Sequence, residues 1–218
     1  MIEIFPSLLA ANPIHREGLI TKLEPLVPGF HIDIMDTLFV PNRGISIETT
    51  NKLAKIAIKQ LWIHLMVKEP EAFLELLDIP AGSIVSFHIE ARTNTPRLIQ
   101  KISDQGWLPS MAINPETSIE ELFPYLDPLY QVLIMSVKPG FSGQFFLQDT
   151  MKKIDPLVGF RSTSGLKFKI AMDGGIGIGN IAELAAKGVD QVAVGSDIFN
   201  HALGAVEAYK LLEENVSS

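Results

Sequence analysis

Eight short apolar segments alternate along this chain with eight longer amphipathic segments, and this alternation sharply limits the folds open to it. We expect strands at 2–9, 29–34, 60–66, 83–89, 107–113, 130–136, 167–172 and 190–195. We expect helices at 13–24, 46–58, 70–78, 94–105, 117–123, 148–158, 177–187 and 198–214. The 218 residues give about 27 residues per strand–helix unit, a spacing typical of compact βα repeats.

Several of the predicted strands are apolar almost throughout, as in QVLIMSV, KFKIAM and QVAVG. Such strands belong to parallel sheets whose outer face is covered by helices. No linker, charge block or low-complexity stretch divides the chain, so the eight units predict one α/β domain over residues 1–218, a closed (β/α)₈ TIM barrel. An open doubly wound sheet is the alternative, but no GxGxxG turn follows the first predicted strand.

The composition excludes several classes of protein. A net charge of −7 leaves no basic surface for nucleic acid, and the absence of cysteine excludes disulfides and thiolate chemistry. The start MIEIFPSLL has neither the basic residues nor the long apolar stretch of a signal peptide. No apolar run approaches the roughly 18–20 residues that a membrane span needs. We therefore expect a cytoplasmic protein that contacts no membrane.

Three of the predicted strands end in side chains that can bind a metal, in FHIDIMD at 30–36, LWIHLM at 61–66 and IAMDGG at 170–175. His31 and Asp33 project from one face of their strand, because side chains alternate with a period of two. His64 and Asp173 end two other strands, and in a barrel all these ends meet at one mouth. Two imidazoles and two carboxylates suit one divalent transition metal. The alternative interpretation is a set of buried polar side chains that pair only with one another.

Glycine-bearing turns follow the last three predicted strands, as PGFSGQ at 139–144, DGGIGIGN at 173–180 and VGSDIF at 194–199. Glycine lets a backbone approach a ligand closely, and amides at the start of a helix suit an anion. Phosphate sites recur after strands seven and eight of this fold. We therefore expect a phosphate to bind here, with ordinary βα loop geometry as the alternative.

Taken together, these segments resemble the ribulose-phosphate 3-epimerases. The runs that carry the resemblance appear in the family's order from residue 4 to about residue 200: IFPSLLAAN, FHIDIMD, FVPN, HLMVKEP, FHIEA, INPET, MSVKPGFSGQFF, MDGGI and VGSDIF. The resemblance implies an isomerase of the pentose phosphate pathway that interconverts D-ribulose 5-phosphate and D-xylulose 5-phosphate. It implies one divalent metal ion, with zinc, iron(II), manganese and cobalt all compatible with the ligands. It also implies a homo-oligomer, because the family forms dimers and larger rings.

The family's functional residues can be placed on matching positions of this chain. The metal ligands fall on His31, Asp33, His64 and Asp173, with Asp33 resembling the proton acceptor and Asp173 the donor. The substrate contacts fall on Ser7, His64, Gly140, Phe141, Ser142, Gly143, Gly174, Gly175, Gly195 and Ser196. Met35, Met66 and Met135 match methionines that line the family's reaction cavity, with ordinary core filling as the alternative.

The chemistry of such a reaction requires groups on two sides of the substrate. Inverting a carbon next to a ketone removes a proton from one face and returns one to the other, and one base cannot easily reach both faces. Asp33 and Asp173 come from predicted strands two and seven, three steps apart around the barrel. The enediolate formed between the two transfers is negatively charged, and a metal can stabilise it as a Lewis acid.

The chain departs from the family's pattern mainly in loops expected to cover the sugar, at Thr37, Leu38, Ser46, Ile47 and Ser142. These changes leave the sugar identity open, with epimerisation of another ketose phosphate such as a hexulose 6-phosphate as the alternative.

Other functions on a similar barrel are less compatible with these residues. A decarboxylase would need a lysine between its strand-two acids, and a Schiff-base aldolase a lysine at the mouth, where we find none. A non-catalytic phosphate-binding barrel is the third alternative. His88, followed by Glu90, ends strand four, and we expect it to line the pocket or to support the ligands from behind.

Overall fold

The computed structural model describes residues 1–91 and 93–217, and their eight strands form one parallel sheet. Around the sheet the strands follow the order β1-β8-β7-β6-β5-β4-β3-β2. The strands are β1 (Glu3–Pro6), β2 (Gly29–Met35), β3 (Gln60–Met66), β4 (Ile84–His88), β5 (Leu108–Ile113), β6 (Gln131–Met135), β7 (Lys169–Asp173) and β8 (Gln191–Val194). Each lies within one of the eight predicted segments or extends it by one residue.

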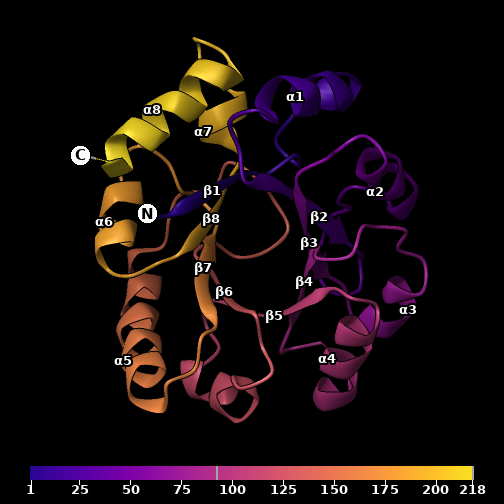
Figure 1. Cartoon of the computed structure of the whole chain (residues 1–218), viewed down its shortest axis with the longest axis vertical. Helices are drawn as coiled ribbons and strands as arrows, with labels where there is room; N and C mark the ends of the chain where they lie inside the picture. The colour runs from indigo at the N-terminus through magenta and orange to yellow at the C-terminus, as the bar shows by residue number, and fades with distance from the viewer. Residues whose placement is uncertain (92, 218) are drawn as a thin grey trace.

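The two ends of this sheet meet and close it into a barrel. Ser7, just beyond β1, forms a parallel bridge with His31 of β2, and the amide of Leu8 donates to the carbonyl of His31 at 2.9 Å. The strands form a central ring and the helices surround it (Figure 1). The predicted (β/α)₈ barrel is therefore confirmed, and the open doubly wound alternative is wrong.

Helical segments connect most successive strands on the outside of the barrel. The α-helices are α1 (Arg16–Leu23), α2 (Ile47–Ala54), α3 (Pro70–Leu74), α4 (Thr95–Asp104), α5 (Ile154–Ser164), α6 (Ile181–Ala186), α7 (Ser196–Phe199) and α8 (Ala205–Ser217). Three 3₁₀ helices accompany them: η1 (Pro13–His15), η2 (Ile119–Tyr125) and η3 (Gln148–Lys153).

Several of the predicted helices differ from the observed elements. The segment predicted at 13–24 begins as η1 and becomes α-helical only at Arg16. The segment predicted at 117–123 is the 3₁₀ helix η2, which contains Pro124, a residue that lacks the amide hydrogen an α-helix would use. The segment predicted at 198–214 is divided between α7 and α8, with Gly204 at a φ of +84° between them. The segment predicted at 148–158 begins as η3 and becomes α-helical only at Ile154.

A chain of polar side chains crosses the barrel interior on the N-terminal side of the metal-binding residues. The Trp62 indole donates to Ser86 at 2.7 Å and packs edge-on against the His31 ring, with centroids 4.7 Å apart. The chain continues through Ser110, Gln131 and Gln191 to Glu3. The side chains from Trp62 to Gln191 are fully buried, so this polar floor holds the lower face of His31 in a fixed environment.

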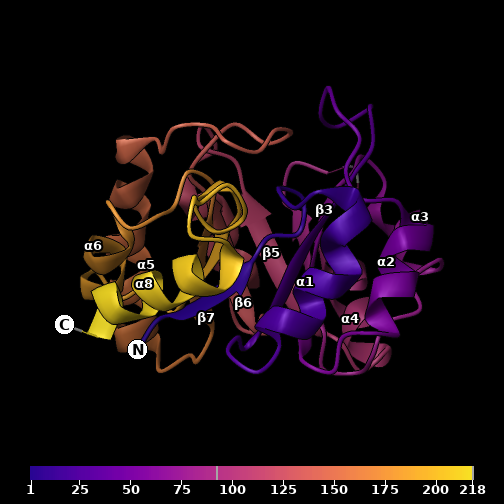
Figure 2. The same cartoon turned by 90° about the horizontal axis from the view of Figure 1, so that it is seen from above.

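The loops at the opposite end, after the C-terminal ends of the strands, form the mouth of the barrel. In Figure 2 the loops after β2 and β6 lie above the same end of the barrel. The Asn42 side chain, in the first of these loops, donates to the carbonyl of Gly140 in the second at 2.6 Å. None of the helices in the described part of the chain has the length and apolar character that crossing a membrane requires.

Candidate metal centre and its cavity

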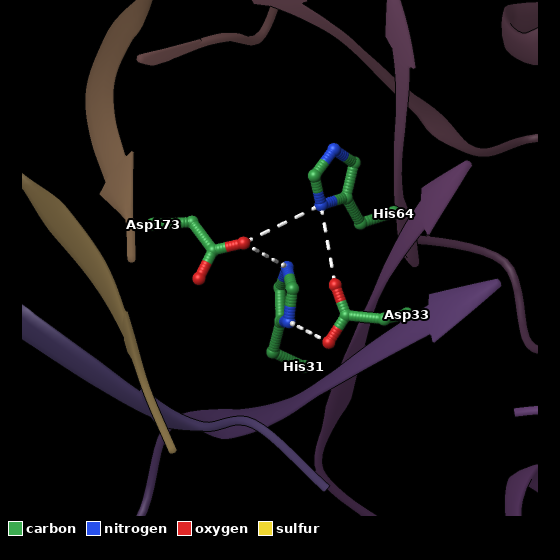
Figure 3. Close-up of side chains that lie close together, drawn as sticks. All are labelled: His31, Asp33, His64 and Asp173. Carbon is green, nitrogen blue, oxygen red and sulfur yellow. Dashed lines mark ion pairs between the residues drawn. The ribbon is translucent and has the colours of Figure 1, made fainter. Parts of the chain in front are cut away.

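The side chains of His31, Asp33, His64 and Asp173 converge at the mouth of the barrel (Figure 3). His31 and Asp33 come from β2, His64 from β3 and Asp173 from the last position of β7. Each residue offers one ligand atom, and these atoms all lie within 4.8 Å of one another. Side-chain alternation explains the convergence, because β2 and β3 are paired with Asp33 opposite His64, so both face inward.

Each imidazole directs a nitrogen toward the two carboxylates. His64 Nδ1 lies 3.3 Å from Asp33 Oδ1 and 3.5 Å from Asp173 Oδ2. His31 Nε2 lies 4.0 Å from the same oxygen of Asp173. The four groups thus surround one common point, as Figure 3 shows.

Two of the nitrogens that face this point are buried and have no hydrogen-bond partner. They are His31 Nε2 and His64 Nδ1, in side chains that are fully buried. A buried nitrogen without a partner is costly, and neutral imidazole nitrogens with nearby carboxylates are ligands that divalent transition metals accept. These four residues therefore fit a metal ion.

The electrostatics of the cluster also favour a cation at its centre. Burial would lower the pKa of His64, but its interactions with Asp173 and Asp33 outweigh burial and raise that pKa to about 9. Burial would raise the pKa of Asp33, but the neighbouring His31 and His64 rings hold it well below its ordinary value. The two carboxylates therefore stabilise positive charge between them.

The other nitrogen of His31 is held by a short local network. His31 Nδ1 lies 3.3 Å from Ser7 Oγ, and that hydroxyl donates to Asp33 Oδ2 at 2.9 Å. Because Ser7 follows β1, this network also joins the two strands that close the barrel. It fixes the orientations of His31 and Asp33 together.

A cavity opens directly above the cluster, and most of the sequence-predicted site residues line it. Its walls include Ser7, Asp33, Met35, Met66, Met135, Gly140, Phe141, Ser142, Gly143, Asp173, Gly174, Gly175, Gly195 and Ser196. His31 and His64 are fully buried and are not among its lining residues, so His64, also expected to contact the substrate, does not reach the cavity wall. His88 does not line this cavity; it is fully buried behind His64, with Nε2 to Nε2 at 2.9 Å.

Six further residues of the cavity wall were not singled out from the sequence. They are Leu9, Val137, Pro139, Gln144, Ile176 and Ala193. Pro139 and Gln144 belong to the PGFSGQ turn, and Ala193 faces inward on β8, so motif membership and strand alternation were the available signals. Ile176 belongs to the DGGIGIGN turn, and Leu9 and Val137 lie within the runs IFPSLLAAN and MSVKPGFSGQFF, so motif membership was the available signal for these three as well.

The glycine turns after β6 and β7 are packed against each other at one side of this cavity. Gly175 has a φ of +62°, and a Cβ there would lie 2.5 Å from the Phe146 amide nitrogen. Gly174 has a φ of +117°, and its Cβ would meet the Val137 side chain. Only glycine fits these positions without moving the neighbouring backbone or side chain, so the cavity wall here is made of closely approaching main chain.

The loop residues at which the chain departs from the expected pattern lie mostly outside the cavity. Thr37 and Leu38 are exposed, and neither lines it. Ser46 is the N-cap of α2, and its side chain accepts a hydrogen bond from the amide of Thr49. Ile47 is the first residue of that helix. Ser142 alone among the five residues lines the cavity.

Comparison with protein families gives a match over nearly the whole chain. The model of the ribulose-phosphate 3 epimerase family matches residues 3–199. A ribulose-phosphate 3-epimerase of Methanocaldococcus jannaschii is 37% identical over 201 residues, covering 91% of this chain and 85% of that protein. The cytoplasmic isoform of ribulose-phosphate 3-epimerase from rice is 38% identical over 205 residues, covering 92% of this chain and 88% of that protein.

Solved structures with low sequence identity share the fold. One is N-(5'-phosphoribosyl)anthranilate isomerase from Pyrococcus furiosus, with a TM-score of 0.67 at 10% identity. The alignment covers 100% of this chain and 99% of that one. At this identity the likeness supports the barrel architecture alone.

Proposed function

The chain belongs to the ribulose-phosphate 3-epimerase family, and on that premise we propose that it interconverts D-ribulose 5-phosphate and D-xylulose 5-phosphate at the mouth of its barrel. The observation that carries the proposal is the pair of carboxylates, Asp33 and Asp173, that face each other across two buried imidazole nitrogens without partners. Both carboxylates also line the cavity, where a sugar can reach them.

The two carboxylates have separate origins that suit two-sided proton transfer. Asp33 belongs to β2 and Asp173 to β7, with β1 and β8 between them around the barrel. Asp33 accepts the proton from carbon 3 of the ketose, since its low pKa keeps it ionised, and Asp173 returns a proton to the opposite face. Each positioned acid or base contributes roughly 10²–10⁴-fold to the rate of such a reaction.

His31, Asp33, His64 and Asp173 would hold one divalent metal ion, as the unpartnered nitrogens support. When bound, the metal supplies Lewis-acid stabilisation of the negative charge that develops on the substrate oxygens. The ligand set is compatible with zinc, iron(II), manganese or cobalt. Metal analysis of the purified protein selects among them.

The remaining cavity residues position the sugar phosphate. Main-chain groups of Gly175, Gly195 and Ser196 form one side of the cavity and are the proposed phosphate contacts, because their closely packed backbone can approach an anion. Met35, Met66 and Met135 form an apolar wall that excludes water from the reacting carbon without adding a competing base.

A pentulose phosphate is favoured over a hexulose phosphate because four of the five loop departures, all except Ser142, lie away from the cavity wall. The rice relative is named a cytoplasmic isoform, which supports a cytoplasmic location for this chain. The proposed homo-oligomer rests on the family resemblance, and sedimentation velocity tests it.

Exchange of the carbon 3 proton with deuterium tests the proposed reaction. In D₂O with zinc, the wild-type chain should wash deuterium into carbon 3 of D-ribulose 5-phosphate, as followed by proton NMR. Asp33→Asn and Asp173→Asn should each lower the exchange rate by at least about 10², because each removes one proton-transfer group. Circular dichroism should show that both variants remain folded.

Asp190→Asn is the matched control, since Asp190 precedes β8 at the far end of the barrel, where it pairs with Arg161. That variant should exchange at close to the wild-type rate. Full activity in either cavity variant contradicts the assignment. A hexulose 6-phosphate that exchanges faster than the pentulose phosphate contradicts the choice of sugar.

A further inference from the structure

The nitrogen of His64 that faces away from the metal centre is in contact with a second buried histidine. His64 Nε2 and His88 Nε2 are 2.9 Å apart, and both side chains are fully buried. On its far side, His88 Nδ1 lies 3.2 Å from Glu90 Oε2. The other oxygen of Glu90 accepts the backbone N–H of Asn114 at 2.8 Å. These contacts form a hydrogen-bonded series of three side chains, His64, His88 and Glu90, that runs outward from the metal centre; it is called the His64–Glu90 chain below.

The donors and acceptors along the His64–Glu90 chain determine where its protons lie. Burial would raise the pKa of Glu90, but its hydrogen bonds, first that with His88, lower it to about 2, so Glu90 is ionised and only accepts. His88 must then carry its proton on Nδ1, because that nitrogen faces the carboxylate. A neutral His88 has a lone pair on Nε2, and His64 Nε2 must donate to it.

His64 therefore keeps its proton on Nε2 when it is neutral, and the lone pair is on Nδ1. That nitrogen is the one that faces Asp33 and Asp173 and has no hydrogen-bond partner. The corresponding nitrogen of His31, Nδ1, lies 3.3 Å from Ser7 Oγ and 3.4 Å from Asp33 Oδ2, so its support is local. The support for His64 is longer and leads to the loops after β4 and β5.

We propose that Glu90 and His88 are positioning residues that fix His64 in the tautomer with its proton on Nε2, and so hold Nδ1 ready to bind the metal. The inference rests on the proposed metal centre. Outer hydrogen bonds of this kind orient a ligating histidine and increase its basicity, and losing one typically costs about 10–100-fold in metal affinity.

Neighbouring groups hold His88 and the loop that contacts Glu90 in place. The Phe39 ring packs over His88 with centroids 4.8 Å apart, and the Phe39 amide is held by Asp36 at 2.7 Å. Lys153 donates to the carbonyls of Asn114 and Thr117 at 2.7 Å and 2.6 Å, which anchors the loop that binds Glu90. Asp36 therefore stabilises the loop after β2, because its carboxylate accepts hydrogen bonds from backbone amides of that loop.

Glu90→Gln is an informative variant because it keeps the size of the side chain but leaves only one acceptor oxygen. The Asn114 amide and His88 Nδ1 both need an acceptor there, so one of them loses its partner. If the amide nitrogen of the new side chain faces His88, the proton order along the His64–Glu90 chain is reversed and places a proton on His64 Nδ1.

The test measures zinc affinity by competition with a chelator, together with ¹⁵N NMR of the histidine rings. We expect Glu90→Gln to weaken zinc binding about 10–100-fold. Ser83→Ala is the matched control: Ser83 precedes β4 at the opposite end of the barrel, and the variant removes a part-buried hydrogen bond to the Pro80 carbonyl, so zinc affinity should change less than about twofold. In the zinc-loaded wild-type protein, the spectrum should show protons on His64 Nε2 and His88 Nδ1.

Zinc affinity of Glu90→Gln within twofold of the wild-type value overturns the proposal. A His64 ring protonated on Nδ1 in the zinc-loaded wild-type protein also overturns it, and this measurement needs no variant to fold. Wild-type protein that takes up no zinc overturns the proposed function itself. Equal zinc affinity of the wild-type protein and Glu90→Gln removes only the proposed role of Glu90 and His88.

Discussion

Glu90 is a partly buried carboxylate whose ionisation links the site to the stability of the fold. Its pKa is lowered to about 2 from an ordinary value of 4.5, because hydrogen bonds from His88 and Asn114 outweigh the effect of burial. A group with a lowered pKa in the folded state contributes stability above its unfolded pKa and loses it as the pH falls through the folded value. This contribution should be complete above about pH 4.5 and should decline toward pH 2.

The prediction is tested by urea unfolding of metal-free wild-type protein and Glu90→Gln between pH 7 and pH 3. The difference in unfolding free energy between them should shrink as the pH falls, by at most about 2 kcal/mol between pH 7 and pH 3, because the rest of the loss occurs below pH 3. A difference that stays constant across this range contradicts the assigned ionisation of Glu90.

At the scale of single residues, the sequence indicated which side chains face inward but not which of them touch. Strand alternation places His31, Asp33, His64 and Asp173 at strand ends, and the structure brings these four together. The contact between His64 and His88 depends on the register of β3 and β4, in which His64 is opposite Ser86. Register is set by packing across strands, so the sequence left the place of His88 open.

At the scale of elements, strands were predicted better than helices for a physical reason. A buried parallel strand is a short continuous apolar run, which the sequence displays plainly. The ends of the helices depend on local backbone features instead: Pro124 keeps η2 from becoming an α-helix, and Gly204 separates α7 from α8. Whether such a residue shortens, splits or ends a helix is decided by tertiary packing.

The packed glycine turns lead to a prediction about substrate binding. Gly175→Ala places a Cβ 2.5 Å from the Phe146 amide nitrogen in a left-handed backbone conformation, so the turns after β6 and β7 must move apart. Because such strain amounts to roughly 1–3 kcal/mol, KM for D-ribulose 5-phosphate should rise by at least about fivefold. Steady-state kinetics with zinc present provides the measurement.

Gly179→Ala is the control from the same turn, since a Cβ there meets nothing within 4 Å. Its KM should stay within about twofold of the wild-type value. Equal KM values for the two alanine variants would show that the close approach of the two turns does not shape the phosphate side of the cavity.

At the scale of the whole molecule, the barrel turns distant parts of the sequence into one site. His31 and Asp173 are separated by 142 positions, yet ring closure between β1 and β2 brings their side chains to the same point. The count of eight strand–helix units made this closure predictable. Which loops would contact each other, such as those joined by Asn42 and Gly140, could not be predicted because loop paths are not encoded in periodic patterns.

One bound cation shared by four side chains from three strands is the premise on which the chemistry depends. Crystals of the protein soaked with zinc and measured at the zinc absorption edge locate that cation by its anomalous scattering. We expect one peak about 2.0–2.2 Å from His31 Nε2, His64 Nδ1 and one oxygen each of Asp33 and Asp173. Zinc bound elsewhere on the protein, with no peak among these four side chains, would contradict the account.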